Sequence, residues 1–142
     1  MTERRARRSA AWAALAAWAT AVLSAAPMLA LAAGPPLLIH YNERPPQHYT
    51  RHGVAQGPAI DKVSGALVAA GIAYELRSTP AKQQLVILKA NSQPACMLAW
   101  VGLPGRERSG KLSAPVYDER RLWCTLSVPD ETMQRLNAAL IK

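Results

Sequence analysis

The sequence between residues 37 and 103 alternates short apolar runs with helix-like stretches, and this regular alternation limits the folds open to the chain. The runs 37–41, 72–78 and 95–103 predict strands, because each is either apolar throughout or alternates apolar with polar residues. The stretch 58–71 has apolar residues spaced three and four apart, and 80–91 begins at a proline, so both predict helices. Strands that alternate with helices indicate an α/β fold with a mainly parallel sheet and helices on both faces.

Two further elements are predicted toward the end of the sequence. The run 121–128 predicts a fourth strand, and 130–142 predicts a last helix that begins with acids and ends in lysine, as the helix dipole favours. In such α/β sheets, ligands bind beyond the carboxyl ends of the parallel strands. Those ends are followed here by the loop 42–57, the turn 77–80 and the stretch 102–108. We therefore expect a ligand site among these segments.

The first 32 residues predict a secretory signal peptide. Four arginines precede a long alanine-rich apolar stretch, and Ala30-Leu31-Ala32 provides small residues for cleavage at its end. We expect cleavage after Ala32 or Ala33 and export by the general secretory route. The alternative is an uncleaved membrane anchor, since the apolar stretch is long for a signal peptide. Its alanine content and Pro27 favour cleavage.

The chain of 142 residues has room for one domain with a real core, and its formal net charge is +8. The lysines and arginines are scattered, and an exported protein rarely meets nucleic acid, so we expect no nucleic-acid partner. The charge is interpreted as a mild attraction for acidic ligands or surfaces.

The two cysteines, Cys96 and Cys124, have two interpretations. In an oxidising compartment they could form a disulfide bond. Cys96 lies in an apolar run, however, where a free buried cysteine is also common.

The sequence shows no constellation typical of an enzyme or a metal site. His48 and His52 are four residues apart but lie in a loop rich in proline and glycine, and together with His40 they have no acid or cysteine cluster to complete a metal site. No serine stands in a nucleophile-elbow motif, and no glycine-rich phosphate loop is present. We therefore expect a protein that is not an enzyme and needs no cofactor.

A series of motifs follows the predicted elements in order between residues 37 and 125. They are a Pro-containing loop after the first strand, G-x-x-x-D at the first helix, a proline opening the second, P-x-R-E after the third strand, and Ser-x-Pro-x-Tyr. The residues concerned are Pro45 and Pro46; Gly57 and Asp61; Pro80; Pro104, Gly105, Arg106 and Glu107; and Ser113, Pro115 and Tyr117. This ordered set resembles the family 3 extracellular solute-binding proteins, which are periplasmic binding proteins with a type II two-lobed fold.

The resemblance implies that the chain folds as the first lobe of such a protein, a three-layer α/β/α structure whose second lobe is largely missing. The implied organisation is a signal peptide at 1–32, a solute-binding lobe at 33–118, and the truncated start of the hinge and second lobe at 119–142. The segment after Tyr117 is too short for a second lobe, which needs about 100 residues.

The resemblance further implies a periplasmic protein that binds a small, amino-acid-like solute with a carboxylate and serves an inner-membrane permease of the ABC type or a sensor. Arg106 would bind the carboxylate, because its planar guanidinium matches two carboxylate oxygens and keeps its charge. Tyr41, Tyr49 or Trp100 would supply an apolar wall. The alternatives are a plain surface arginine for Arg106, core packing for Trp100, and a structural or interaction protein that keeps half of the fold without binding a ligand.

Three places differ from the pattern of this family. Glu43 and Arg44 stand where an aromatic residue usually precedes the loop prolines, and Gln83 or Gln84 stands where the second helix often has an arginine or other polar anchor. Residues 101–103 are Val, Gly and Leu where small or hydroxyl residues are common. Hydroxyl contacts to an α-amino group are therefore missing from this segment.

Overall fold

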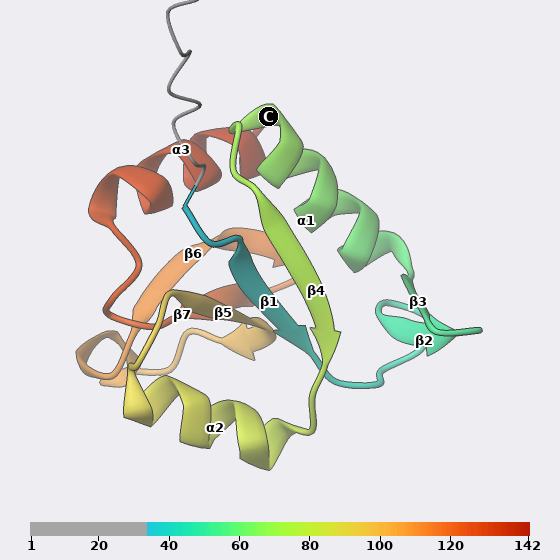
Figure 1. Cartoon of the computed structure of the whole chain (residues 1–142), viewed down its shortest axis with the longest axis horizontal. Helices are drawn as coiled ribbons and strands as arrows, with labels where there is room; N and C mark the ends of the chain where they lie inside the picture. Colours follow the sequence, from blue (N-terminus) through green and yellow to red (C-terminus); the bar gives the residue numbers. More distant parts are fainter. Residues whose placement is uncertain (1–33) are drawn as a thin grey trace, which may run out of the picture. The chain divides into compact units, whose positions relative to one another are not determined.

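The central feature of the fold is a five-stranded mixed sheet, seen in a computed structural model that describes residues 34–142 (Figure 1). Its strands lie in the spatial order β4-β1-β5-β7-β6. They are β1 (Leu37–Tyr41), β4 (Tyr74–Ser78), β5 (Ala95–Val101), β6 (Lys111–Tyr117) and β7 (Arg120–Cys124). β1 pairs in parallel with β4 and β5, whereas β7 pairs antiparallel with both β5 and β6. The predicted α/β class is confirmed.

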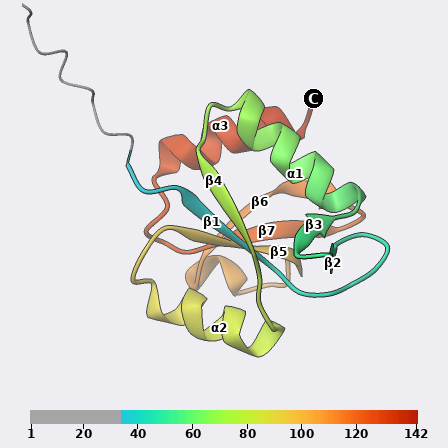
Figure 2. The same cartoon turned by 45° about the vertical axis from the view of Figure 1, so that its right-hand side comes forward.

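Three α-helices cover the two faces of this sheet. Helices α1 (Pro58–Ala69) and α3 (Asp130–Leu140) lie together on one face, and α2 (Ala81–Ala90) lies on the other (Figures 1 and 2). The three-layer α/β/α arrangement expected from the sequence is thus present. Helix α1 begins at Pro58, as predicted. Proline suits the first turn of a helix because the backbone N–H groups of that turn have no partner within the helix, so the N–H that proline lacks is not missed.

Each face of the sheet has its own apolar core. The larger core joins α1 and α3 to the sheet, with Ile39, Leu67 and Leu136 completely buried. The smaller core joins Leu88 of α2 to Met97 and to other residues on the opposite face. Because the central strands are covered on both sides, β1 has five buried residues in succession.

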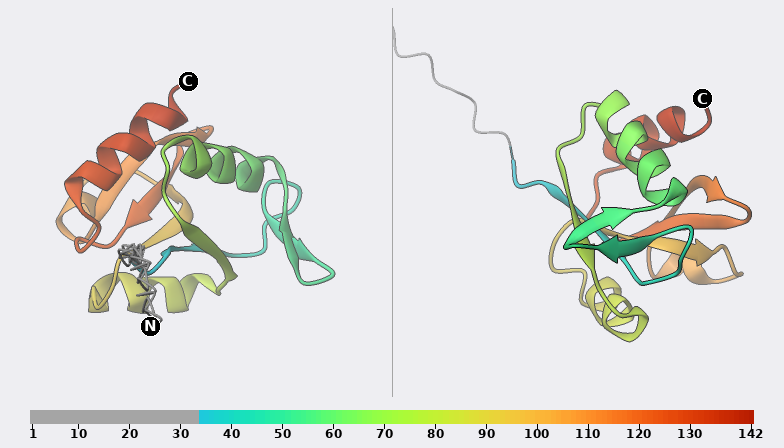
Figure 3. Two further views of the ribbon diagram at one scale, coloured as in Figure 1. Left: turned by 45° about the horizontal axis from the view of Figure 1, so that its top comes forward. Right: turned by 90° about the vertical axis from the view of Figure 1, so that its right-hand side faces the viewer.

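Two parts of the sheet structure were missing from the sequence prediction. The loop 42–57 contains a small antiparallel hairpin of β2 (Tyr49–Arg51) and β3 (Val54–Gln56), which extends beside the start of α1 (Figure 3). Strand β6 lies in a stretch that was not assigned to a strand from the sequence, and it contains Pro115, a residue type that is rare inside strands. The structure places β6 at the sheet edge, where a proline costs no ladder hydrogen bond.

Residues 119–142 lie within the same compact unit as the preceding lobe. The resemblance assigns them to the start of a hinge and second lobe; in the structure they form the whole of β7 and the whole of α3. A two-residue turn at Asp118 and Glu119 returns the chain from β6 into β7, which inserts between β5 and β6. The return strand is antiparallel, so the sequence pattern of alternating strands and helices could not indicate its position.

Cys96 and Cys124 form a disulfide bond between neighbouring strands β5 and β7. Both residues are completely buried in the larger core. The sequence left open whether the two cysteines form a disulfide bond or are free; in the structure they form the bond.

The predicted signal peptide at 1–32 lies outside the described residues. Among residues 34–142, no helix combines the length and the apolar character needed to cross a membrane.

Candidate functional site

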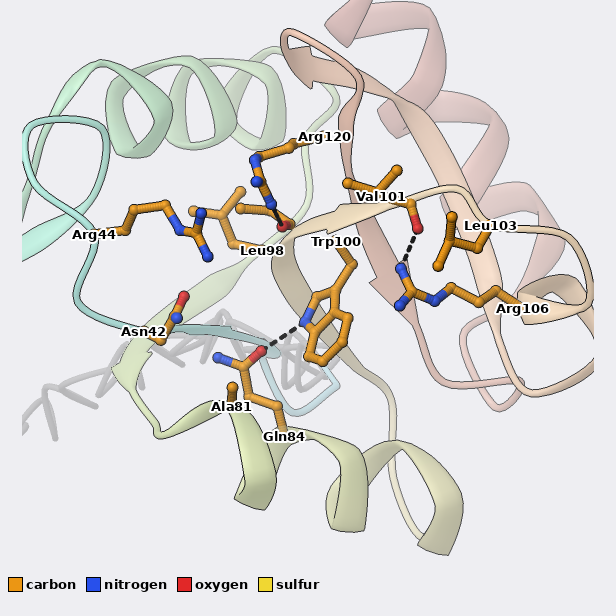
Figure 4. Close-up of a pocket in the computed structure, with 11 residues that line it drawn as sticks. Asn42, Arg44, Ala81, Gln84, Leu98, Trp100, Val101, Leu103, Arg106 and Arg120 are labelled. Atoms are coloured by element: carbon orange, nitrogen blue, oxygen red, sulfur yellow. Dashed lines mark hydrogen bonds between the residues drawn. The ribbon is translucent and has the colours of Figure 1, made fainter.

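A pocket of about 330 Å³ opens at the edge of the sheet where β1 and β5 end (Figure 4). This is the edge predicted to hold a ligand, because the carboxyl ends of parallel strands meet there. The lining combines polar, basic and apolar side chains. It consists of Asn42, Arg44, Ala81, Gln84, Leu98, Ala99, Trp100, Val101, Leu103, Arg106 and Arg120.

Four segments carry these residues to one place. The loop after β1 supplies Asn42 and Arg44, and the first turn of α2 supplies Gln84. Strand β5 runs into the short 3₁₀ helix η1 (Arg106–Arg108), which starts with Arg106. Because β7 is antiparallel to β5, its first residue, Arg120, reaches the same edge.

An irregularity in β5 turns Trp100 into the pocket. The pairing of β5 with β7 shifts register between Met97 and Trp100, and Ala99 has a φ of 71°. This left-handed conformation is costly for a residue with a side chain and is typically retained where it serves a site. The indole Nε1 of Trp100 then donates a hydrogen bond to Oε1 of Gln84 at 2.8 Å.

Arg106 packs against two tryptophans that also contact each other. Its guanidinium carbon lies 5.1 Å from the ring centroid of Trp100 and 5.0 Å from that of Trp123, distances typical of cation–π contacts. One guanidinium nitrogen, Nη1, donates to the carbonyl oxygen of Val101, and the Nε1 of Trp123 donates to the carbonyl oxygen of Arg106. Since a guanidinium has five N–H donors, further donors remain for a ligand.

The pocket is strongly basic. Arg44, Arg106 and Arg120 line it, and no acidic side chain of the described residues does. Nη1 of Arg120 donates to the carbonyl oxygen of Ala99 at 3.0 Å, which fixes this side chain against the irregular part of β5. Within the described part of the chain, none of the three arginines takes part in an ion pair.

Glu43 stands between Asn42 and Arg44 in sequence but does not line the pocket. Its carboxylate accepts hydrogen bonds from the hydroxyl and the backbone amide of Thr50, at 2.6 and 2.8 Å, and from the hydroxyl of Ser78. These bonds lower the pKa of Glu43, with the Thr50 hydroxyl as the main cause. The carboxylate of Glu43 therefore stabilises the loop 42–57 through these hydrogen bonds and does not face the pocket.

His48 fixes the loop that carries Asn42 and Arg44. It is completely buried, and its Nδ1 lies 2.6 Å from the carbonyl oxygen of Asn42. A carbonyl can only accept, so Nδ1 carries the proton and Nε2 accepts from the hydroxyl of Tyr117 at 3.2 Å. Burial lowers the pKa of His48, and the charges of Arg44 and Arg120 lower it further.

The structure brings together two of the four residues predicted for ligand binding. Arg106 and Trp100 line the pocket, whereas Tyr41 and Tyr49 do not. Tyr41 is buried in the larger core and its hydroxyl bonds to Thr50 at 2.9 Å, while Tyr49 lies in the β2–β3 hairpin.

Sequence reasoning did not assign binding roles to Arg44, Gln84 and Arg120. Arg44 and Gln84 stand at positions where this sequence differs from the pattern of the family that it resembles. Because the family uses those positions for ligand contacts, the two differences could have indicated that these residues lie in the site. No signal pointed to Arg120, because its place depends on the antiparallel return of β7.

No metal site emerges from the described residues. Within residues 34–142 no group of three or more His, Cys, Asp or Glu side chains is arranged to hold an ion. His40 and His48 are buried, and each has a hydrogen-bonded ring nitrogen, His40 to the hydroxyl of Thr79.

Solved structures of amino-acid-binding proteins share this fold. The arginine-bound form of domain 1 from TmArgBP aligns with a TM-score of 0.59 at 13% identity, covering 74% of this chain and 90% of that domain. A mutant of the same domain, also arginine-bound, gives the same TM-score and identity and is covered to 88%. The arginine-, lysine-, histidine-binding protein ArtJ from Geobacillus stearothermophilus aligns with a TM-score of 0.51 at 19% identity, covering 57% of this chain.

This chain spans 36% of ArtJ but nearly all of the isolated TmArgBP domain. No protein-family model matches the sequence, and the comparison with curated proteins gives no match. The resemblance drawn from the sequence motifs is therefore confirmed at the level of the fold: residues 34–142 are built like a single lobe of an arginine-binding protein.

Proposed function

We propose that the pocket at the edge of β1 and β5 binds a small polar solute with a carboxylate, of the amino-acid type. The observation that carries this proposal is the position of Arg106 beside Trp100 in that pocket. The guanidinium offers paired donors for a carboxylate, and the indole offers an apolar surface for the rest of the solute. A volume of about 330 Å³ suits a small molecule.

The structural neighbours support the proposed class of ligand, because they are amino-acid-binding proteins. Domain 1 of TmArgBP is a single domain with arginine bound, so in that protein one lobe holds an amino acid by itself. A second lobe is therefore not a requirement of the fold for binding. By analogy, the lobe described here binds its solute in the open pocket without enclosing it.

The proposed role is capture of a solute outside the cytoplasm for an inner-membrane permease of an ABC-type transporter or for a sensor. The predicted signal peptide at 1–32 supports export, and the buried disulfide bond fits an oxidising compartment. Mass spectrometry of the exported protein tests this step. We expect a chain that begins at residue 33 or 34 and carries the Cys96–Cys124 bond; a retained residue 1–32 segment would instead indicate a membrane anchor.

Binding is tested with purified protein and a panel of amino acids and small organic acids. We expect at least one compound to raise the unfolding midpoint, since a ligand that binds only the folded state stabilises it. Calorimetric titration of that compound then gives the dissociation constant. In Arg106→Gln we expect this constant to rise by about tenfold or more, because a charge-assisted hydrogen bond is lost.

Arg108→Gln is the matched control. Arg108 lies in the same 3₁₀ helix, and its replacement changes the net charge equally, but it does not line this pocket. We expect wild-type affinity for this variant. If no compound binds, or if both variants bind like the wild type, the proposal is wrong and a structural or interaction role becomes the better explanation.

A further inference from the structure

The charge of the pocket indicates more about the ligand than one carboxylate does. We infer that the pocket takes a small dicarboxylate, with one carboxylate held by Arg106 and the other by Arg44 and Arg120. This inference rests on the proposed function, because it names the class of ligand for the same pocket. It assigns binding roles to two arginines that lie outside the motifs found in the sequence.

Arg44 and Arg120 form one positive end of the pocket. They come from separate segments, the loop after β1 and the first residue of β7, and both are close enough to His48 to lower its pKa. In Figure 4 their guanidinium groups lie on the Leu98 side of Trp100. Two guanidinium groups at one end can together hold a carboxylate or neutralise its charge.

Arg106 forms the other positive end. It is fixed against Trp100 and Trp123, and Figure 4 shows it across the indole of Trp100 from Arg44 and Arg120. The surface between the two ends includes Leu98 and Trp100, which can contact a short carbon chain. The pocket therefore matches a ligand that has an anionic group at each end and carbon atoms between them.

The balance of charge favours two anionic groups over one. Three like charges that line one pocket repel one another, and no acidic side chain among the described lining residues offsets them. A dianion offsets more of this repulsion than a monoanion does. The same field disfavours a ligand with a cationic side chain, so we expect no binding of L-arginine, the amino acid bound by domain 1 of TmArgBP.

Matched pairs of probes test the inference. The pairs are L-glutamate with L-glutamine and glutarate with its monoamide; each replaces one carboxylate by a neutral amide of similar shape. Dissociation constants are measured by calorimetry on the purified protein at one ionic strength. We expect the dicarboxylate of at least one pair to bind about tenfold tighter than its amide. In Arg44→Gln and Arg120→Gln we expect this preference to fall toward one.

Arg51→Gln is the control for net charge, because Arg51 is exposed in β2 and does not line the pocket. It should keep the full preference. Arg44 is also exposed, so Arg44→Gln provides the test even if Arg120→Gln does not fold.

Four outcomes would overturn the inference. If the acid and the amide of each pair bind with equal affinity, and both lose affinity in Arg106→Gln, the pocket has no second anionic subsite. The inference is then wrong, but the proposed function still holds. Inorganic phosphate that binds tighter than glutarate and L-glutamate would indicate one compact anion site. An equal loss of preference in Arg51→Gln would indicate a general effect of charge. If no carboxylate of any kind binds, the proposed function fails together with the inference.

Discussion

Trp100 donates a hydrogen bond from its indole Nε1 to Oε1 of Gln84 at 2.8 Å, across the pocket from β5 to α2. The Nε2 of the same amide donates to the carbonyl oxygen of Thr79 at 2.9 Å. An indole nitrogen can only donate and a carbonyl can only accept, so the two partners fix the orientation of the amide. Gln84, which is 1% exposed, thus holds the pocket wall in place.

Replacement of Gln84 by leucine should loosen this wall. The substitution leaves the Nε1 of Trp100 and the carbonyl of Thr79 without their partner, and we expect a loss of about 1–3 kcal/mol in the free energy of unfolding. Urea unfolding measures this loss, and tryptophan fluorescence reports the changed surroundings of Trp100. Gln83→Leu is the control, because Gln83 is exposed on the same helix. Equal stability of both variants would contradict the role given to Gln84.

The stability of the protein should fall as the pH falls below about 6.5. Burial lowers the pKa of both His40 and His48 from the ordinary value of 6.5, and neighbouring arginines lower it further. Between the lowered pKa and 6.5, the unfolded chain binds more protons than the folded one, so acid favours unfolding there. The stability from these residues is complete above pH 6.5 and decreases toward the folded pKa.

Urea unfolding at several pH values between 5 and 8 measures this dependence. Glu43 does not contribute to the pH dependence in this range, because its pKa lies below the ordinary value of 4.5. His48→Gln should reduce the slope of stability against pH, whereas His52→Asn, at an exposed position of the β2–β3 turn, should retain it. A slope unchanged by His48→Gln and by His40→Gln would refute the assignment to these histidines.

Much of the fold could be predicted because the chain signals its elements locally. The apolar run of β1, the proline at the start of α1 and the covered strand β5 each follow from the side chains within the element. Strand β6 could not be found in this way, since Pro115 is tolerated only because the strand lies at an edge. That edge position is a property of the whole sheet.

The residues of the candidate site also fall into two groups: those that local sequence could indicate and those whose place depends on the whole sheet. Arg106 was predicted because it belongs to a motif that resembles a known family, and Trp100 was one of three aromatic residues considered for an apolar wall. Arg120 was missed because its place depends on β7 lying antiparallel to β5, more than a dozen residues after the segment that carries Arg106. Tyr41 was assigned to the site although its side chain enters the core, because a strand that is buried on both faces gives no sequence signal for side-chain direction.

Reduction of the disulfide bond should destabilise the lobe. The bond closes a loop with a sequence separation of 28 residues between β5 and β7, and loop-closure entropy predicts a contribution of about 3–4 kcal/mol. We expect a lower urea midpoint for the wild type in the presence of reductant. The double variant Cys96→Ala/Cys124→Ala should be destabilised and insensitive to reductant. A wild-type midpoint unaffected by full reduction would show that the bond contributes little.

Gly57, at the start of α1, should not tolerate alanine. It has a φ of 117°, and an added Cβ would collide with the carbonyl group of Gln47. That carbonyl accepts the amide proton of Ala59, which ties the loop bearing Arg44 to the helix. Gly57→Ala should therefore displace this loop, lower the free energy of unfolding by more than about 1 kcal/mol and weaken ligand binding. Urea unfolding and calorimetric titration measure the two effects.

Gly65, within the same helix, provides the matched control. It is exposed, and an added Cβ would have no atom within 4 Å beyond the neighbouring residues and the helix backbone. Alanine is the better helix former because it loses less conformational freedom on folding, so Gly65→Ala should stabilise the protein by about 0.5–1 kcal/mol. Destabilisation of similar size in both variants would show that the close approach of Gln47 to Gly57 does not matter.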